Sequence, residues 1–510
     1  MGRMTLDTFA GGGVVEPIEA DAVNSRTERA LYAARVKVFP QAVWGTFRRL
    51  KWWIMAVTLG VYWVTPWLRW NRGPSAPDQA VLVDLANRRF YFFFIEIWPQ
   101  EFYYVAGLLI MAGLGLFLVT SVVGRAWCGY TCPQTVWTDL FIAVERLVEG
   151  DRNARMRLDK ARWGAEKIVK RVSVHALWIV IAVATGGAWV FYFADAPALA
   201  VDLVTLKAPP VAYMTIGILT FTTYVFAGFM REQVCTYMCP WPRIQGAMLD
   251  EDSLIVTYND WRGEPRSRHQ KQAAREGRDV GDCVDCNACV AVCPMGIDIR
   301  HGQQLECITC ALCIDACNSI MDKVGKPHGL ISYSTLKDFN LHTATAAVAG
   351  REAAKAEQRR VSLSHIARPR TVIYATLWSL IGVAMVVSLL LRDRLDVNVL
   401  HERNPLFVTL ADGSIRNTYA LKLLNMEPEP RTFLVRLQDL PGAEMWHAGA
   451  EEERGTAFEV SVEPDRVREL RVFVTAPAGF HGTTDFVFRV TDEAEGETAR
   501  AGAQFHGPQP

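Results

Sequence analysis

The sequence has no excess of charge of either sign, since its 510 residues include 54 Lys and Arg and 54 Asp and Glu. A chain without a broad basic field does not attract nucleic acid, so we expect no nucleic-acid partner. Several cofactor motifs are also absent: Cys-x-x-Cys-His for c-type haem, the P-loop, and Gly-x-Gly-x-x-Gly after a strand for dinucleotides. The first 30 residues contain no basic stretch followed by an apolar one, so we predict no cleavable signal peptide.

Half of the residues are hydrophobic, and many of them gather in five long stretches that are almost free of charge. These stretches are 52–70, 102–124, 174–193, 211–230 and 371–391. Each is close to the ~20 residues that a helix needs to cross a bilayer, and five in one chain argue against buried helices of a soluble protein. We therefore predict a multi-domain membrane protein whose α-helical transmembrane bundle of about five spans occupies 52–250 and, for the last helix, 371–391.

The basic residues of the loops alternate along the chain. Residues 1–51 hold eight Lys and Arg, 71–101 hold three, 125–173 hold ten, and 194–210 hold one. The positive-inside rule therefore predicts that the N-terminal segment 1–51, the loop 125–173 and the long basic segment 231–370 are cytoplasmic. Five crossings would then leave the part from Arg392 onward on the outer side.

Eight of the 12 cysteines form two runs with the spacing Cys-x2-Cys-x2-Cys-x3-Cys, and both runs lie in the segment 251–336. This is the bacterial ferredoxin pattern, in which three thiolates of one run and the fourth thiolate of the other run hold each cluster. We predict one [4Fe–4S] cluster on Cys283, Cys286, Cys289 and Cys317. We predict the other cluster on Cys307, Cys310, Cys313 and Cys293. A pair of zinc sites is the alternative, and disulfides are less compatible with a reducing compartment.

The remaining four cysteines form two copies of Cys-x3-Cys-Pro, each following a long apolar run. "CGYTCP" contains Cys128 and Cys132, and "CTYMCP" contains Cys235 and Cys239. Because a residue before proline avoids the helical region, we expect a turn at each second cysteine. Four thiolates that meet at two helix ends would be soft ligands suited to Cu(I), zinc or iron–sulfur. Packing as small buried apolar side chains is the plain alternative.

Residues 392–510 have a different character, with short runs of alternating apolar and polar residues separated by Gly, Pro and Asp. Runs at a spacing of about ten residues predict an antiparallel β-sandwich with an immunoglobulin-like fold. This part contains no cysteine, so no disulfide joins the sheets. The Ala- and charge-rich segment 337–370 is expected to connect the cysteine-rich part to the last span. We interpret His175, at the start of the third span, as an interfacial residue rather than a ligand.

Together these features resemble the FixG/CcoG-type accessory proteins of cbb-type cytochrome oxidase, a family related to membrane polyferredoxins. The resemblance rests on the two Cys-x3-Cys-Pro motifs, the eight ferredoxin cysteines, the helical bundle around them and the C-terminal β domain. It implies a multi-pass protein of the bacterial cytoplasmic (inner) membrane, with a cytoplasmic ferredoxin domain and a periplasmic β domain. It also implies an oxidoreductase that assists oxidase assembly by reducing Cu(II) to Cu(I).

The resemblance assigns catalysis and copper contact to the two Cys-x3-Cys-Pro motifs, which here means Cys128, Cys132, Cys235 and Cys239. The implied partners are copper ions and oxidase assembly factors or a copper-transporting ATPase. No flavin or haem site is visible, so the unknown electron donor is a soluble carrier, a partner protein or membrane quinol. Two other functions stay open: an electron-transfer subunit for a partner membrane complex without a copper substrate, and an assembly scaffold with structural clusters.

Overall fold

The computed structural model describes residues 15–24, 36–74, 76–357, 366–427, 429–494 and 496–509. The chain forms two compact units, each with a buried core of its own. The first contains Met1–Leu68 and Val81–Val383, and the second contains Arg69–Ala80 and Ala384–Pro510. Parts of the predicted N-terminal segment 1–51 and of the connector 337–370 lie outside the described residues.

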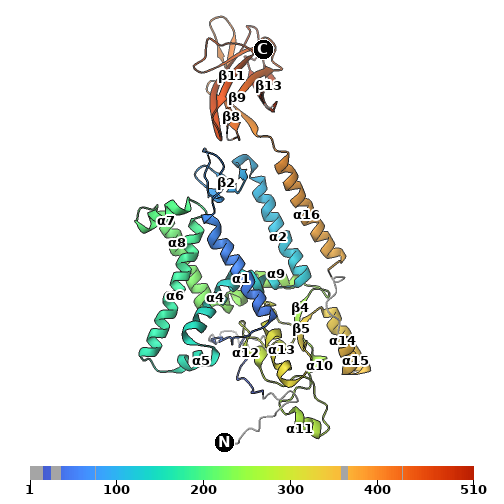
Figure 1. Cartoon of the computed structure of the whole chain (residues 1–510). Helices are drawn as coiled ribbons and strands as arrows, with labels where there is room; N and C mark the ends of the chain where they lie inside the picture. Colours follow the sequence, from blue (N-terminus) through green and yellow to red (C-terminus); the bar gives the residue numbers. More distant parts are fainter. Residues whose placement is uncertain are drawn as a thin grey trace. The chain divides into compact units, whose positions relative to one another are not determined.

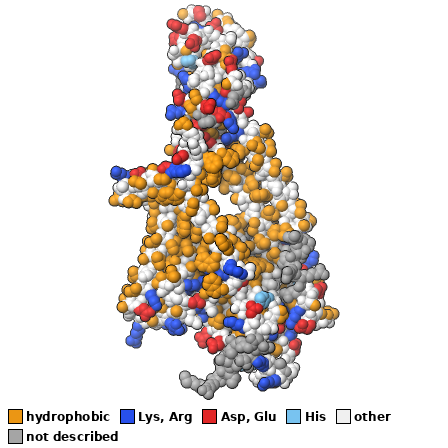
Figure 2. Space-filling view, viewed as in Figure 1, with side chains coloured by type: hydrophobic (Ala, Val, Ile, Leu, Met, Phe, Trp, Pro, Cys, Tyr) orange, Lys and Arg blue, Asp and Glu red, His pale blue; other side chains and the backbone are white. Residues whose placement is uncertain are grey.

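Four helices of the described chain are long and apolar enough to cross a membrane (Figure 1). They are Pro99–Val123, which includes α2 (Tyr103–Val123), α6 (Ala165–Val190), Pro210–Met230 and α16 (Pro369–Leu390). The third of these combines α8 (Pro210–Thr223) with the π-helical turn η3 (Tyr224–Met230). Figure 2 shows apolar side chains gathered over these helices, as expected for a surface that a lipid bilayer covers. The predicted helical membrane bundle is confirmed, with four helices that meet this criterion.

The two ferredoxin-type cysteine runs fold into a small α/β part around buried apolar cores. Strands β4 (Ile255–Tyr258) and β5 (Ile331–Ser334) pair in antiparallel fashion. Between them lie α10 (Asp260–Gly263), α11 (Gln270–Arg275), α12 (Ala288–Ala291), the 3-10 turn η5 (Ile299–His301) and α13 (Leu312–Val324). Residues 15–24 attach here, because the Ile18 N–H donates to the Cys286 carbonyl at 2.9 Å.

Helix α1 (Thr46–Val64) takes the place of the first predicted span, 52–70, but its boundaries differ. It begins earlier than predicted and ends where Pro66 enters the 3-10 turn η1 (Thr65–Trp67). Its N-terminal turns also carry three basic residues, Arg48, Arg49 and Lys51. These charges distinguish α1 from the four more apolar helices.

Contacts at its two ends show that α1 runs the length of the bundle. The backbone N–H groups of Phe47 and Arg48 donate to the Asp315 carboxylate of α13, in the cysteine-rich part. At the other end of α1, the Tyr62 hydroxyl donates to the Thr185 carbonyl, near the end of α6. With 19 residues, α1 is about 28 Å long at 1.5 Å per residue, close to the thickness of a bilayer core.

Shorter elements link the long helices of the first unit. Those between α2 and α6 are α3 (Ala126–Tyr130), α4 (Pro133–Glu149) and α5 (Arg152–Lys160). Those after α6 are α7 (Ala196–Val204), the π-helical turn η4 (Val234–Met238) and α9 (Trp241–Met248). A small antiparallel sheet precedes α2 and consists of β1 (Val81–Asp84), β2 (Arg89–Phe92) and β3 (Ile95–Ile97), followed by η2 (Pro99–Glu101). Helices α14 (Leu336–Ala349) and α15 (Arg351–Glu357) come before α16.

The second unit is dominated by two antiparallel sheets. The first has the order β10-β12-β8-β6 with β7 beside β8, and the second has the order β11-β9-β13-β14. The strands are β6 (Leu395–His401), β7 (Val408–Thr409), β8 (Ile415–Asn425), β9 (Arg431–Gln438), β10 (Glu444–His447), β11 (Ala457–Val462), β12 (Arg466–Ala476), β13 (Thr483–Asp492) and β14 (Thr498–His506). Along β8, Tyr419, Leu421 and Leu423 are fully buried and alternate with partly exposed residues, which is the period of a half-buried strand. The predicted immunoglobulin-like β-sandwich is confirmed.

Candidate functional site

The two ferredoxin-type cysteine runs adopt the same backbone turn although their sequences differ. In the first run Asp285 and Asn287, on either side of the second cysteine, have φ values of 48° and 58°. In the second run Thr309 and Ala311 occupy the matching positions, with φ values of 57° and 59°. Non-glycine residues rarely adopt this left-handed conformation, so its repetition indicates a turn that the site requires. Turns of this kind point backbone N–H groups toward an electron-rich group.

The fourth cysteine of each run lies beside the cysteines of the other run. Burial, followed by the neighbouring Cys286 and Cys283, raises the pKa of the Cys317 thiol to about 12. Burial, followed by two cysteines of the second run, raises the pKa of the Cys293 thiol to about 12. The structure thus forms two groups of thiols, which are Cys283, Cys286, Cys289 and Cys317, and Cys293, Cys307, Cys310 and Cys313. The ferredoxin spacing predicts the same two sets, and their role as cluster ligands stays a prediction.

Each of these groups supplies four thiols, the donor set that a [4Fe–4S] cluster takes. Among the described residues, no three His, Cys, Asp or Glu side chains converge as the ligands of one ion would. In a [4Fe–4S] cluster each thiolate binds a different iron, so the sulfur atoms lie farther apart than those around zinc. The backbone N–H groups of Ala288 and Thr309 face the sulfur atoms of Cys286 and Cys307. Hydrogen bonds of this kind tune the reduction potential of a cluster.

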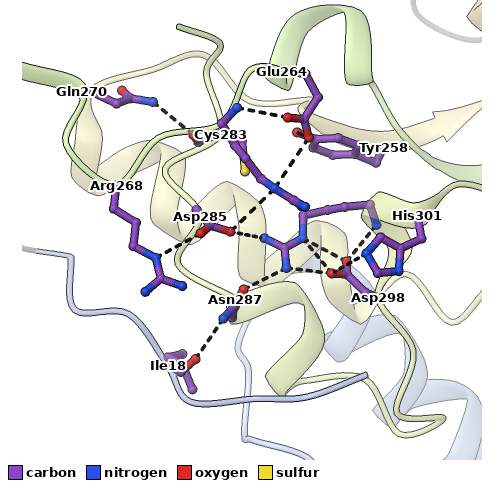
Figure 3. Close-up of polar contacts among 12 residues, drawn as sticks. Ile18, Tyr258, Glu264, Arg268, Gln270, Cys283, Asp285, Asn287, Asp298 and His301 are labelled. Carbon is purple, nitrogen blue, oxygen red and sulfur yellow. Dashed lines mark hydrogen bonds and ion pairs between the residues drawn. The ribbon is translucent and has the colours of Figure 1, made fainter. Parts of the chain in front are cut away.

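Arg300 holds the loop of the first run in place from outside, and Figure 3 shows its partners Asp285, Asn287 and Asp298. It lies on η5 and donates to Asp285 at 2.7 Å, to Asn287 at 2.8 Å and to Asp298 at 2.7 Å. Burial alone would raise the pKa of the Asp298 carboxyl, but the hydrogen bonds and charge of Arg300 keep this pKa below its usual value. The two left-handed residues of the loop are therefore fixed by a charged side chain that also interacts with the Cys283 thiol.

Each Cys-x3-Cys-Pro motif forms the predicted turn at its second cysteine. Cys132 has φ −57° and ψ 128°, and Pro133 then begins α4. Cys239 has φ −78° and ψ 121°, between η4 and α9. The two motifs differ in the preceding turn, which is α-helical in α3 and π-helical in η4. Single π-helical turns are frequent at functional sites.

The thiols of the two motifs lie close enough together to affect the pKa values of Cys128 and Cys235. Burial is the main cause that raises the pKa of Cys128 to about 11, and Cys132 and Cys239 add to it. Burial, followed by Cys132 and Cys128, raises the pKa of Cys235 to about 12. The Cys128 thiol also donates to Gln245 Oε1 of α9 at 2.9 Å. Cys128 and Cys235 also pack against one apolar core, so the structure brings the two distant motifs together in what we call the thiol cluster, Cys128, Cys132, Cys235 and Cys239.

The first motif packs directly on the loop of the second ferredoxin run. A Cβ atom added to Gly129 would lie 2.6 Å from the Ile308 carbonyl oxygen and 3.0 Å from Cys310 Cα. The Tyr130 hydroxyl donates to the Cys310 carbonyl at 3.2 Å. Tyr237, which has the matching position in the second motif, is 59% exposed, whereas Tyr130 is 6% exposed. The repeated tyrosines thus have different surroundings, and Tyr130 links the thiol cluster to the second ferredoxin run.

Sequence reasoning missed a network of buried ion pairs beside the thiol cluster. Glu145 of α4 accepts hydrogen bonds from Arg231, at 2.6 Å, and from Arg155. Glu149 of the same helix pairs with Arg171 of α6 at 3.0 Å. Breaking a buried pair costs about 3–5 kcal/mol, so the network holds α4 against α6 and η3. The sequence offers one signal, two acidic residues four positions apart on the same face of a largely apolar helix.

Three matches to protein families cover the features described above. Residues 105–149 match a family described as "4Fe-4S binding domain", and residues 230–336 match a "4Fe-4S dicluster domain". Residues 385–508 match a family described as "IG-like fold at C-terminal of FixG". The first match contains Cys128 and Cys132, and the second contains the other ten cysteines. The chain is therefore a multi-pass membrane iron–sulfur protein with a C-terminal Ig-like domain.

The chain is 62% identical over 477 residues to the nitrogen fixation protein FixG of Rhizobium meliloti (strain 1021), covering 91% of both chains. It is 55% identical over 484 residues to Protein RdxB of Cereibacter sphaeroides, covering 94% of this chain and 98% of the relative. The chain belongs to the FixG family, as the resemblance in its motifs indicated. Among solved structures, a FixG-related protein from Vibrio parahaemolyticus matches at 20% identity with a TM-score of 0.20, over 22% of this chain and 97% of that one.

Proposed function

We propose that this FixG-family protein is a membrane oxidoreductase that reduces Cu(II) to Cu(I) for the copper centre of a cytochrome oxidase. The ferredoxin cysteines would hold two [4Fe–4S] clusters that supply one-electron transfer, and the thiol cluster would hold the copper. The observation that carries this proposal is the packing of Gly129 and Tyr130 on the Cys310 loop, which sets soft metal ligands against an electron carrier. Thiolates bind Cu(I) better than Cu(II), so a copper ion held by them is more easily reduced.

The clusters, when bound, supply reversible one-electron transfer. Their proposed ligands are Cys283, Cys286, Cys289 and Cys317 for one cluster, and Cys307, Cys310, Cys313 and Cys293 for the other. The chain itself buries four of these cysteines and half-buries the other four, and it holds the first loop through Arg300. At the thiol cluster, burial keeps Cys128 and Cys235 protonated until a metal displaces the protons. The Cu(I) product then passes to an oxidase assembly factor or a copper-transporting ATPase.

We also propose that the thiol cluster and the ferredoxin part face the cytoplasm and that the β domain faces the periplasm. The alternation of basic loops supports this orientation. The N-terminal residues bind the ferredoxin part, and α2 ends at the motif that also contacts it, so α1 is a fifth crossing. Alkaline phosphatase fused after Arg394 should be active, and the same enzyme fused within 151–170 should be inactive. The opposite pattern would mean that a crossing has been miscounted.

The copper proposal predicts that the four thiols act as one unit. In the Cys128→Ser/Cys132→Ser variant, Cu(I) binding and Cu(II) reduction should fall strongly, because two soft ligands are lost. The iron content should stay near that of the wild type, since no ferredoxin cysteine is changed. Cys235→Ser/Cys239→Ser should have a similar effect, and the quadruple variant should be little worse than either double variant. Copper titration and anaerobic Cu(II) reduction measure both quantities.

Tyr237→Phe is the matched control, because it alters a motif residue and keeps all 12 cysteines. Additive losses in the two double variants would indicate two separate copper sites instead of one. Loss of iron in either double variant would make the motif thiols ligands of a further cluster, to which the family match over 105–149 would then correspond. Full copper reduction by the quadruple variant would show that the thiol cluster is structural.

A further inference from the structure

A cavity of about 770 Å³ lies where α4, α6 and the π-helical turn η3 meet. Its apolar wall includes Val172, Trp178 and Phe229, and its polar wall includes Glu145, Arg171 and Arg231. Val172 and Phe229 are also well exposed on the apolar surface of the bundle. The cavity is therefore accessible from the surface that a bilayer covers, and its volume is that of a small-molecule site.

The His175 ring lies among aromatic rings in this cavity. Its centre is 5.8 Å from that of Phe229, with an interplanar angle of 13°, and 5.2 Å from that of Trp178, at 89°. Its Nδ1 lies 3.0 Å from the Tyr224 hydroxyl, and the described part of the chain offers no hydrogen-bond partner for Nε2. In one tautomer Nε2 donates to a carbonyl oxygen, and in the other it accepts from a hydroxyl group. These features suit a flat ring that carries oxygen atoms at its edge.

The charges around the cavity favour a neutral ligand. The cationic side chains already have acceptors: Arg231 pairs with Glu145 at 2.6 Å, Arg171 with Glu149 at 3.0 Å, and Lys37 with Asp159 at 2.9 Å. Lys167 donates to the carbonyl oxygens of Asp159 and Ala161. An anionic lipid headgroup would have to break these pairs, at a cost that a neutral molecule avoids.

Arg231 connects this cavity with the thiol cluster. It lines the large cavity and also a small one of about 30 Å³, whose other walls include Cys235 and Ile308. Ile308 belongs to the second ferredoxin run, on which Gly129 packs. Arg231 is thus shared by the cavity in which a reductant would bind and by the small cavity beside Cys235.

We propose that this cavity binds a membrane quinol and that the quinol is the electron donor. The inference rests on the proposed function, which needs a reductant that the motifs of the chain do not provide. One quinol loses two electrons and two protons to become a quinone, and the two electrons reduce two Cu(II) ions to two Cu(I) ions. His175 Nε2 accepts a proton from the quinol oxygen beside it, and both protons are released to water at the edge of the cavity, where the Asp159 side chain is 40% exposed.

The test uses the full-length protein with its clusters in lipid nanodiscs and decylubiquinol as the probe. Stopped-flow absorbance follows cluster reduction. His175→Phe keeps an aromatic ring but removes Nε2, so the reduction rate should fall about tenfold for the loss of one hydrogen bond to the reacting oxygen. Val172→Trp fills the cavity from its apolar side and should raise the apparent KM for decylubiquinol. Val180→Trp lies on the same helix and is the control, since Val172 and Val180 are 61% and 64% exposed.

Dithionite should reduce the clusters of all these variants at the wild-type rate. The proposal is overturned if decylubiquinol does not reduce the wild-type clusters, or if His175→Phe and Val172→Trp both behave like Val180→Trp. A separate assay gives Cu(II) to the dithionite-reduced protein. If that protein reduces Cu(II) while the quinol has no effect, the quinol site is wrong and the copper function stands. If the quinol reduces the clusters and Cu(II) is not reduced, the quinol site stands and the copper function is wrong.

Discussion

Cys317→Ser should remove about four of about eight iron atoms per chain, and the lost iron should belong to the cluster of the other run. Cys317 is part of the second run, yet its thiol lies beside Cys286 and Cys283 of the first. Anaerobic protein should be analysed for iron and acid-labile sulfide and by EPR after reduction with dithionite. The wild type should show two interacting paramagnetic centres, and the variant should show one isolated centre.

Double variants show whether each cluster takes cysteines from both runs or from one run alone. Cys317→Ser with Cys283→Ser should lose no more iron than Cys317→Ser alone, because both residues would serve one cluster. Cys317→Ser with Cys307→Ser should lose nearly all iron. If each run held its own cluster, the two results would be reversed. Ser319→Ala, an exposed change on the same helix, is the control, and stoichiometric zinc without sulfide in the wild type would contradict both assignments.

Gly129→Ala should strongly lower the rate of Cu(II) reduction, although all 12 cysteines remain in place. The added methyl group would lie 2.6 Å from the Ile308 carbonyl oxygen, so the first motif must move away from the ferredoxin loop. Overpacking of this kind costs about 1–3 kcal/mol of folding stability. The separation of the thiol cluster from the second cluster should also slow electron transfer between them.

Thermal unfolding, iron content and the rate of Cu(II) reduction by the dithionite-reduced protein measure these effects. Gly113→Ala is the matched control, because a Cβ atom there would meet no other atom within 4 Å. We expect Gly129→Ala to lower both the midpoint of unfolding and the reduction rate, and Gly113→Ala to change neither. A wild-type rate of copper reduction in Gly129→Ala would show that this contact is not part of the electron path.

The features that the sequence predicted well depend on short-range patterns. Cysteine spacing within a run is set by the cluster that the run must surround, so both runs were recognisable without knowledge of the fold. The β-sandwich followed from its period-two alternation, since one face of each strand must be buried. The turns at Cys132 and Cys239 followed from the proline after each cysteine.

The features that could not be predicted arise from contacts between distant segments. The partners of Glu145 come from α5 and from the residue after η3, and no local pattern links these positions. Tyr130 and Tyr237 look equivalent in sequence, but one is buried against the Cys310 loop and the other is exposed. The start of α1 was misplaced because its charged first turns are stabilised by partners elsewhere, among them Asp139, which accepts from Arg48 at 2.8 Å.

Asp315 lies on α13 between Cys313 and Cys317, one proposed ligand of each cluster, and its carboxylate accepts the N–H groups of Phe47 and Arg48 at the start of α1. The fit is tight, since a Cβ atom on Gly45 would lie 2.2 Å from Asp315 Cγ. Helix α13, which carries proposed thiol ligands of both clusters, is thus fixed to α1 by hydrogen bonds. Many redox proteins move electrons with a tethered carrier domain that swings between donor and acceptor. In the electron path that we propose, the clusters would be held at fixed positions, so we expect linker length and solvent viscosity to have little influence on the rate of internal electron transfer.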